Sequence, residues 1–270
     1  MDYIIIDPDG IINIIESLKN ASSCGIDGIN AKLLKNTKVP SSLFLAKIFQ
    51  QSLDTGSVPE EWKVGKVIPI RKGGEKNVSN FCPISLTCIA AKILEYIIFK
   101  SVISHLDSNG FFTPYQHGFR KTYSCKSQLL CFTNDCLMNI DSGHTTDAIF
   151  LDFAKAFDKV PHNLLILKLA TLKLDPLILQ WITSFITNRT QFVYANGVSS
   201  SVSSVTSGVP QGTVLGPLLF LIFINDLPEL LSSPIRIFAD DCVIYRKIVS
   251  PIDTTTLQND INKVNDWCST

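Results

Sequence analysis

Three short segments, far apart along the chain, most constrain what this sequence can fold into. They are Ile149–Asp158, Ser207–Pro217 and Ile237–Tyr245. The first contains an apolar run that ends in Asp152, and the third carries the adjacent pair Asp240 and Asp241 between apolar residues. Carboxylates that end strands and converge in space can hold two divalent metal ions roughly 3.5–4 Å apart, which suits phosphoryl or nucleotidyl transfer.

The composition argues against several classes of protein. With 270 residues, 46% hydrophobic and 18% charged, the chain is globular, with a substantial core in one large or two small domains. A formal net charge of zero argues against an overall basic coat for nucleic acid. The longest apolar run, Val214–Ile224, contains Gly216 and Pro217 and is shorter than the roughly 20 residues that span a bilayer. We therefore predict no membrane segment.

The eight cysteines include no CxxC pair, and the four histidines show no ligand spacing relative to them. A zinc site is therefore not expected. Because no signal peptide is recognisable, we interpret the cysteines as reduced thiols of an intracellular protein, in the nucleus or the cytoplasm.

Apolar periodicity predicts the helices and strands. The helical pattern covers residues 11–20, 30–36, 43–53, 86–98, 128–140, 155 to about 174, 214–226 and a terminal segment around 257–264. Strands are predicted at 62–70, 147–153, 235–238 and 242–245, and a hairpin within 191–205 at Asn196-Gly197. Helices alternating with hairpin-connected strands indicate an α+β fold rather than a doubly wound sheet.

The three aspartates have an alternative interpretation. An aspartate at a strand end is often a turn or cap residue, and Asp240 with Asp241 also fits a solvated hairpin tip. However, placing like charges together costs free energy unless a cation neutralises them. With Asp152 in the same chain, we favour the metal site. We expect the nearby Asp158 to cap or pair locally rather than bind metal.

The segment SGVPQG places Gly208 and Gly212 around Pro210 and Gln211. Glycine lets backbone approach a ligand closely, and a loop that leads into a helix offers free N–H groups to phosphate or sugar oxygens. Alone this pattern is weak, but between the two acidic segments it predicts a nucleotide pocket.

The order and spacing of these motifs resemble the palm of reverse transcriptases, specifically those of non-LTR, jockey-like retrotransposons. The segment from Trp62 to Ile98 is similar to the fingers of that family, and QHGFRKTYSC (116–125) resembles a further fingers motif. The likeness covers about residues 20–267. It implies right-hand polymerase fingers and palm, with an antiparallel palm sheet, packed helices and no thumb. The implied parts are a helical lead-in (1–60), fingers (61–140) and palm (141–270).

The resemblance also implies roles for individual residues. Catalytic metal contacts fall on Asp152, Phe153, Asp240 and Asp241, nucleotide contacts on Arg71, Lys72, Phe157, Gln211 and Gly212, and template contacts on Gly118, Phe119, Arg120, Gly208 and Pro210. Phe157 would clash with a ribose 2′-hydroxyl and so favour deoxynucleotides. The implied cofactor is a pair of Mg²⁺ ions, with Mn²⁺ as the alternative, and the partners are an RNA template, a DNA primer and dNTP.

Two departures from the family pattern bear on activity. Cys82 stands where the family has an arginine expected to grip the triphosphate, and a neutral side chain cannot replace that bidentate contact. The chain also ends near Trp267, before the thumb segment of the family. We therefore expect these 270 residues alone to show weak or no processive synthesis.

Other functions remain open. The chain is alternatively a decayed, inactive retroelement remnant or a domesticated palm that binds nucleic acid without synthesis. A viral RNA polymerase is opposed by Phe157, and a two-metal nuclease by the loop that carries Gln211.

Overall fold

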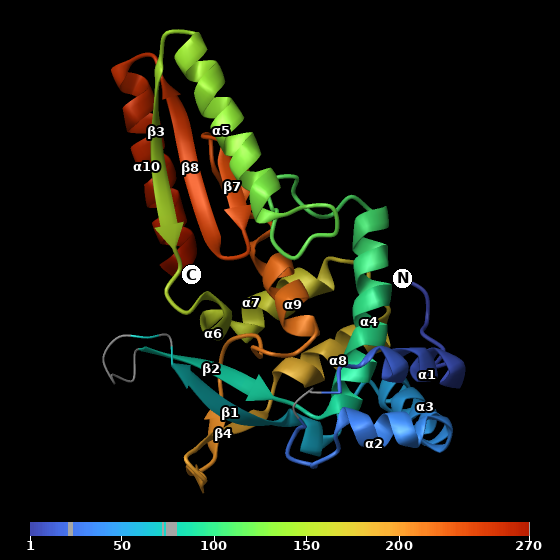
Figure 1. Cartoon of the computed structure of the whole chain (residues 1–270). Coiled ribbons are helices and arrows are strands. Elements are labelled where there is room, and N and C mark those ends of the chain that lie inside the picture. The colour runs from blue at the N-terminus through green and yellow to red at the C-terminus, as the bar shows by residue number, and fades with distance from the viewer. Residues whose placement is uncertain (21–23, 72, 74–79, 270) are drawn as a thin grey trace. The chain divides into compact units, whose positions relative to one another are not determined.

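The computed structural model describes residues 1–20, 24–71, 73 and 80–269 (Figure 1). The chain divides into two compact units, each built from two separate stretches. Unit 1 comprises Met1–Leu106 and Phe157–Leu219, and unit 2 comprises Asp107–Ala156 and Phe220–Thr270. The division into 1–60, 61–140 and 141–270 remains a prediction from the sequence.

Unit 1 contains a five-stranded sheet in the order β2-β1-β4-β5, with β6 also paired to β4. Its strands are β1 (Val64–Arg71), β2 (Phe81–Leu86), β4 (Arg189–Ala195), β5 (Val198–Ser199) and β6 (Ser203–Val205). Strand β1 runs antiparallel to β2 and parallel to β4. Asn196 and Gly197 both have positive φ angles, 53° and 80°, as a tight two-residue hairpin turn requires. The predicted hairpin is thus confirmed.

Helices pack around the core of unit 1. Those wholly within it are α1 (Pro8–Ser17), α2 (Ala31–Asn36), α3 (Lys38–Asp54), α7 (His162–Ala170) and α8 (Pro176–Ile186). Helices α4 (Ile89–Ser108), α6 (Ala156–Lys159) and α9 (Leu215–Ile224) contain the boundaries between the units. The buried Trp181 stacks on Phe185 and donates from Nε1 to the Ser52 hydroxyl at 2.8 Å, which joins α8 to α3.

Two helix predictions are wrong in extent. The single helix expected from 155 to about 174 is divided into α6 and α7 at Val160–Pro161. Proline has no N–H and disfavours helical backbone in the residue before it, so the helix restarts at His162. Leu86, expected in a helix, ends strand β2 instead, and α4 begins at Ile89. Helix α8 and strand β2 had no counterpart among the predicted elements.

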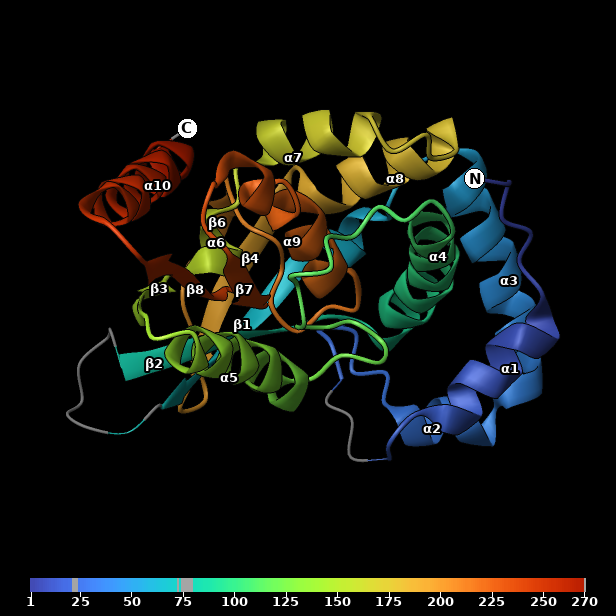
Figure 2. The same cartoon turned by 90° about the horizontal axis from the view of Figure 1, so that it is seen from above.

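Unit 2 contains a three-stranded antiparallel sheet in the order β3-β8-β7. The strands are β3 (Thr145–Asp152), β7 (Ile235–Phe238) and β8 (Asp241–Ile248). Helices α5 (Cys125–Asp141) and α10 (Pro251–Ser269) lie on opposite faces of this sheet (Figure 2). On the α5 side, Asp135 accepts hydrogen bonds from the Tyr245 hydroxyl and from Arg236.

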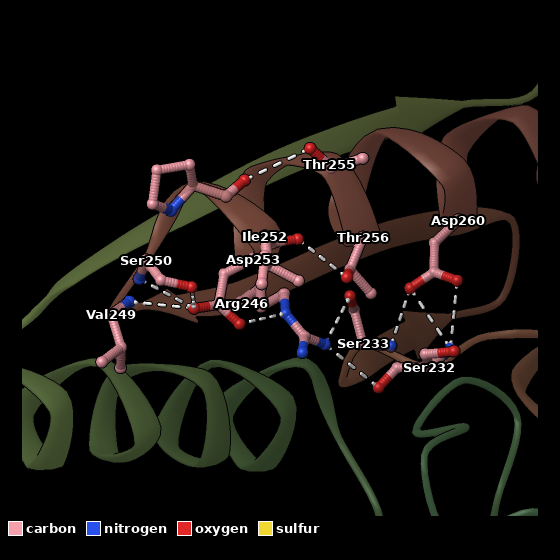
Figure 3. A network of polar contacts seen from close by, with 11 residues as sticks. Ser232, Ser233, Arg246, Val249, Ser250, Ile252, Asp253, Thr255, Thr256 and Asp260 are labelled. Atoms are coloured by element: carbon pink, nitrogen blue, oxygen red, sulfur yellow. Dashed lines mark hydrogen bonds and ion pairs between the residues drawn. The ribbon is translucent and has the colours of Figure 1, made fainter.

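A polar network holds α10 against strand β8 (Figure 3). Arg246 of β8 donates from Nε to Asp253 at 3.0 Å, and the other oxygen of Asp253 accepts from the backbone N–H groups of Val249 and Ser250. These backbone bonds and the arginine lower the pKa of Asp253. About two turns further along, the buried Asp260 accepts the backbone N–H groups at 232 and 233. Helix α10 is therefore fixed at two points.

Within the part of the chain that the structure describes, no helix is both long and apolar enough to cross a membrane.

Candidate active site

Strands β3 and β8 bring two of the three predicted aspartates together. Their antiparallel register pairs Asp152 directly with Asp241. Cα atoms of directly paired residues in antiparallel strands lie roughly 4.5–5.5 Å apart, and their side chains point to the same face of the sheet. Both aspartates are solvent-exposed. Two carboxylates far apart in sequence thus lie side by side at one end of the unit 2 sheet.

Asp240 occupies the turn next to this pair. Strands β7 and β8 pair as far as Phe238 and Asp241, which leaves a two-residue turn of Ala239 and Asp240. Ala239 is buried and has a φ of 57°, a left-handed conformation that glycine adopts far more readily. The half-exposed Asp240 follows it directly.

A cavity of about 280 Å³ opens beside the paired carboxylates. Asp152 and Asp241 line it, together with Phe150 from β3 and with Cys125 and Gln128 from α5. The cavity lies entirely within unit 2 and combines an acidic rim with an apolar wall.

The carboxylates of Asp152 and Asp241 are the kind of donor that a divalent metal ion takes when substrate completes its ligands. Among the described residues, no group of three or more Asp, Glu, His or Cys side chains is arranged to hold a metal ion without help. Mg²⁺ is usually bound by one or two carboxylates together with substrate phosphates and waters, rather than by an all-protein cage. The paired residues Asp152 and Asp241 offer two carboxylates on the same face of the sheet.

Phe153 follows Asp152, and its ring packs against Trp267 of α10 with centroids 6.2 Å apart. An aromatic ring offers no oxygen ligand, so the backbone carbonyl is the only oxygen with which Phe153 can contact a metal ion.

In unit 1, the SGVPQG loop is bound to the segment that begins at Phe157. The N–H of Val209 donates to the Phe157 carbonyl at 2.7 Å, and the Ser207 hydroxyl donates to the Asp158 carbonyl at 2.9 Å. The side-chain amide of Gln211 donates to the Asp158 carboxylate at 3.0 Å. Asp158 was expected to cap or pair locally, but its carboxylate pairs with Gln211 from a distant segment and orients that side chain.

Both glycines of the loop are required by close backbone approach. Gly208 has a φ of +90°, and a Cβ there would lie 2.6 Å from the Asp158 carbonyl oxygen. Gly212 has a φ of +92°, and its Cβ would lie 2.7 Å from the Ser85 carbonyl oxygen. Any other residue at either position would push the loop away from its support.

Comparison with known proteins identifies the family. A family model described as "Reverse transcriptase (RNA-dependent DNA polymerase)" matches residues 70–270. The chain belongs to the reverse transcriptase family. It is 30% identical over 266 residues to the RNA-directed DNA polymerase from mobile element jockey of Drosophila melanogaster, which covers 94% of this chain and 29% of that protein. It is also 24% identical over 255 residues to the Pol polyprotein from the R2 retrotransposable element of Popillia japonica, covering 88% of this chain and 35% of that protein.

The jockey-like kinship predicted from the motifs is thereby confirmed. This reverse transcriptase chain spans about three tenths of the length of the curated relatives it matches most strongly.

The other predicted contacts of this reverse transcriptase lie in both units. Arg71 is exposed at the end of β1 in unit 1, whereas Lys72 lies outside the described residues. Gly118, Phe119 and Arg120 belong to unit 2. Phe119 is 56% exposed, whereas the Arg120 side chain is engaged within unit 2. It forms an ion pair with Asp107 and lies over the ring of Phe112, both in unit 2.

The sequence interpretation missed a buried carboxylate at the end of the SGVPQG loop, where α9 begins. Glu95 of α4 is fully buried, and its Oε2 accepts the backbone N–H groups of Val214 and Leu215 at 2.7 and 3.1 Å. It thus caps the start of α9, directly after the loop. Burial raises the pKa of Glu95 to about 7, although the two N–H groups and the charge of Arg189 act in the opposite direction.

This raised pKa predicts a pH-dependent stability. Because the folded protein holds the Glu95 proton more tightly than the unfolded chain does, the free energy of unfolding should fall as pH rises from 4.5 to about 7. Glu95→Gln keeps an oxygen for the α9 N–H groups and cannot ionise. The wild-type protein should lose about 3 kcal/mol of its free energy of unfolding over that pH window, and the Glu95→Gln variant should not.

Urea unfolding at several pH values measures this difference. The exposed Glu61→Gln is the matched control and should leave the pH slope unchanged. A Glu95→Gln slope equal to that of the wild type would show that the pKa of Glu95 is the same in the folded and unfolded protein.

Gln116 and Cys125 were absent from the predicted site residues except as letters of the QHGFRKTYSC motif, and Gln128 appeared only as the start of a predicted helix. Cys125 and Gln128 face the cavity because α5 covers that face of the sheet, which no local pattern reveals. Glu95 did carry a signal, since a carboxylate between Leu94 and Ile98 interrupts an apolar helix face.

Proposed function

We propose that this chain catalyses RNA-directed DNA synthesis, in which a deoxynucleotide is joined to a primer 3′-hydroxyl along an RNA template. The observation that carries the proposal is the direct pairing of Asp152 with Asp241 beside the Asp240 turn. Membership of the reverse transcriptase family supports the same reaction class. Within this proposal the β3-β8-β7 sheet is the palm, and β1 with β2 belongs to the fingers.

In the proposed mechanism, Asp152, Asp240 and Asp241 hold divalent ions, which we take to be Mg²⁺ with Mn²⁺ as the alternative. When bound, such ions lower the pKa of the primer hydroxyl and neutralise charge on the departing pyrophosphate. The chain itself supplies negative charge at fixed positions, since the strand register orients Asp152 and Asp241 before any ligand arrives. That preorganisation lowers the free-energy cost of assembling the site.

The nucleotide is positioned by residues of unit 1 in this proposal. Gln211, oriented by Asp158, and the backbone at Gly212 contact the incoming nucleotide, while Phe157 excludes a ribose 2′-hydroxyl. Arg71 and Lys72 attract the triphosphate through charge-assisted hydrogen bonds. Template contacts are assigned to residues 118–120 of unit 2 and to Gly208 and Pro210 of unit 1.

Single-nucleotide addition tests this function. The chain is incubated with Mg²⁺, dNTP and a DNA primer on an RNA template, with Ca²⁺ in place of Mg²⁺ as control. We expect template-dependent addition in the presence of Mg²⁺ and none in the presence of Ca²⁺. Tight binding of the primer and template without any addition would instead favour the nucleic-acid-binding alternative, and neither binding nor addition would favour a decayed remnant.

Cys82, which stands where the family pattern has an arginine, is the residue most expected to lower the activity in nucleotide addition. Its backbone lies in β2 opposite Ile70, next to Arg71 at the end of the neighbouring strand. We expect Cys82→Arg to lower the KM for dNTP by about tenfold, since hydrogen bonds to charged groups contribute about 1.5–3 kcal/mol each. Steady-state primer extension measures the change. The exposed Cys268→Arg is the control, whereas Cys88→Arg is unsuitable because Cys88 is buried. An unchanged KM would remove residue 82 from the triphosphate contact.

A further inference from the structure

The turn that carries Asp240 is supported by a side chain from a distant segment. Gln116 is 2% exposed, and its Oε1 accepts the N–H groups of Ala239 at 2.9 Å and of Gly118 at 2.7 Å. Its Nε2 donates to the Ala239 carbonyl at 3.2 Å. One amide therefore satisfies both backbone groups of the left-handed residue in the turn.

The backbone around Gln116 is joined to the same hairpin. The N–H of His117 donates to the Ile237 carbonyl at 2.8 Å, and the N–H of Ile237 donates to the Tyr115 carbonyl at 2.9 Å. Gln116 and Ile237 thus form a parallel bridge at the outer edge of β7. Gln116 is held by this bridge, so its amide approaches Ala239 from a fixed position.

Gly118 completes the contact because it has no side chain. A Cβ at this residue would lie 2.2 Å from the Ala239 nitrogen, a distance that no packing permits. The close packing of the segment Gln116–Gly118 against the turn at Ala239 therefore requires glycine at position 118.

We propose that Gln116 is a positioning residue for the metal-binding carboxylates. It holds Ala239 in a conformation that the alanine alone disfavours, and thereby fixes the direction in which Asp240 and Asp241 leave the turn. The inference rests on the proposed function of these aspartates. Groups that orient metal ligands through a second layer of hydrogen bonds commonly affect metal affinity strongly.

The test uses Gln116→Met, which keeps the volume of the side chain and removes its three hydrogen bonds. Mn²⁺ binding is followed by electron paramagnetic resonance, and amide hydrogen exchange is measured at Ala239. We expect Mn²⁺ affinity to fall by about tenfold. The exposed Gln258→Met on α10 is the matched control and should change neither quantity.

A rescue variant separates positioning from a general loss of structure. Glycine adopts the left-handed conformation without steric cost, so Ala239→Gly in the Gln116→Met background should recover a large part of the Mn²⁺ affinity. Stability lost elsewhere in unit 2 would not be restored by this change. If Gln116→Met is poorly folded, Gln116→Asn, which keeps the amide on a shorter stem, replaces it with the same expectation.

The outcomes distinguish this inference from the proposed function. If Asp241→Asn weakens Mn²⁺ binding and Gln116→Met does not, Gln116 has no positioning role and the metal site stands. If Asp241→Asn leaves Mn²⁺ binding unchanged, the metal site itself is wrong, and Gln116 has no metal ligands to position. Faster exchange at Ala239 with weaker Mn²⁺ binding and rescue by glycine supports the proposal.

Discussion

Asp241→Asn is expected to lower the rate of nucleotide addition by about a thousandfold or more, equivalent to about 4 kcal/mol of transition-state stabilisation. Asparagine has nearly the shape of aspartate, so the strand pairing with Asp152 persists while one negative charge is lost. Asp152→Asn should have a similar effect, because the two residues are paired directly and their side chains lie on the same face of the sheet. Single-nucleotide addition under Mg²⁺ saturation measures both.

The same substitution should leave the fold intact or make it more stable. Like charges directly opposite in a sheet repel, and Asp241→Asn removes that repulsion. We therefore expect an unchanged or higher melting temperature together with lost activity. Asp147→Asn in β3, the strand that pairs with β8, is the control and should preserve the rate. A folded Asp241→Asn protein with wild-type rate would exclude this carboxylate from catalysis.

Phe157→Val is expected to reduce discrimination against ribonucleotides by about a hundredfold. In the proposed pocket the phenylalanine ring occupies the space that a ribose 2′-hydroxyl would need, and valine leaves that space open. The Phe157 carbonyl still accepts the N–H of Val209, so the backbone support of the SGVPQG loop is retained. The measured quantity is the ratio of kcat/KM for dNTP to that for the matching rNTP.

The exposed Phe44→Val on α3 makes the same chemical change elsewhere in unit 1 and should not alter the ratio. An unaltered ratio for Phe157→Val would assign sugar discrimination to another residue. A parallel loss of dNTP and rNTP addition would instead indicate a role in packing.

Much of the carboxylate site was predictable from local pattern. The apolar run that ends in Asp152 and the apolar residues on both sides of Asp240 and Asp241 indicate strands that end in carboxylates. Their pairing depends on register, which follows from the requirement that each strand present its apolar side chains to α5 and α10. The metal assignment itself remains a prediction.

The sequence also carries local signals for helix ends that were not predicted. Asp175 and Pro176 form a helix-start pattern, since the aspartate caps the N–H groups of the first turn of α8 and proline fits its first position. Pro161 likewise marks the break between α6 and α7. These features required only the standard rules for helix ends.

Contacts that join distant segments were beyond local pattern. The parallel pairing of β1 with β4 links residues more than a hundred positions apart, and nothing in either strand names its partner. Gln116 gives no sign in the sequence that its amide will bind Ala239, because that contact depends on the tertiary approach of a loop to a turn. The same holds for Glu95 and the start of α9.

The anchoring of α10 has a consequence for strand β8. Arg246 forms an ion pair with Asp253 of α10. It also donates to the Ser232 carbonyl and the Ser233 hydroxyl just before β7, so strand β8 resists slippage along β7. A shift by a single residue would replace Asp241 with Cys242 opposite Asp152 and turn the carboxylate to the reverse side of the sheet. The contacts of Arg246, remote from the candidate active site, thus help to maintain the register that pairs Asp152 with Asp241.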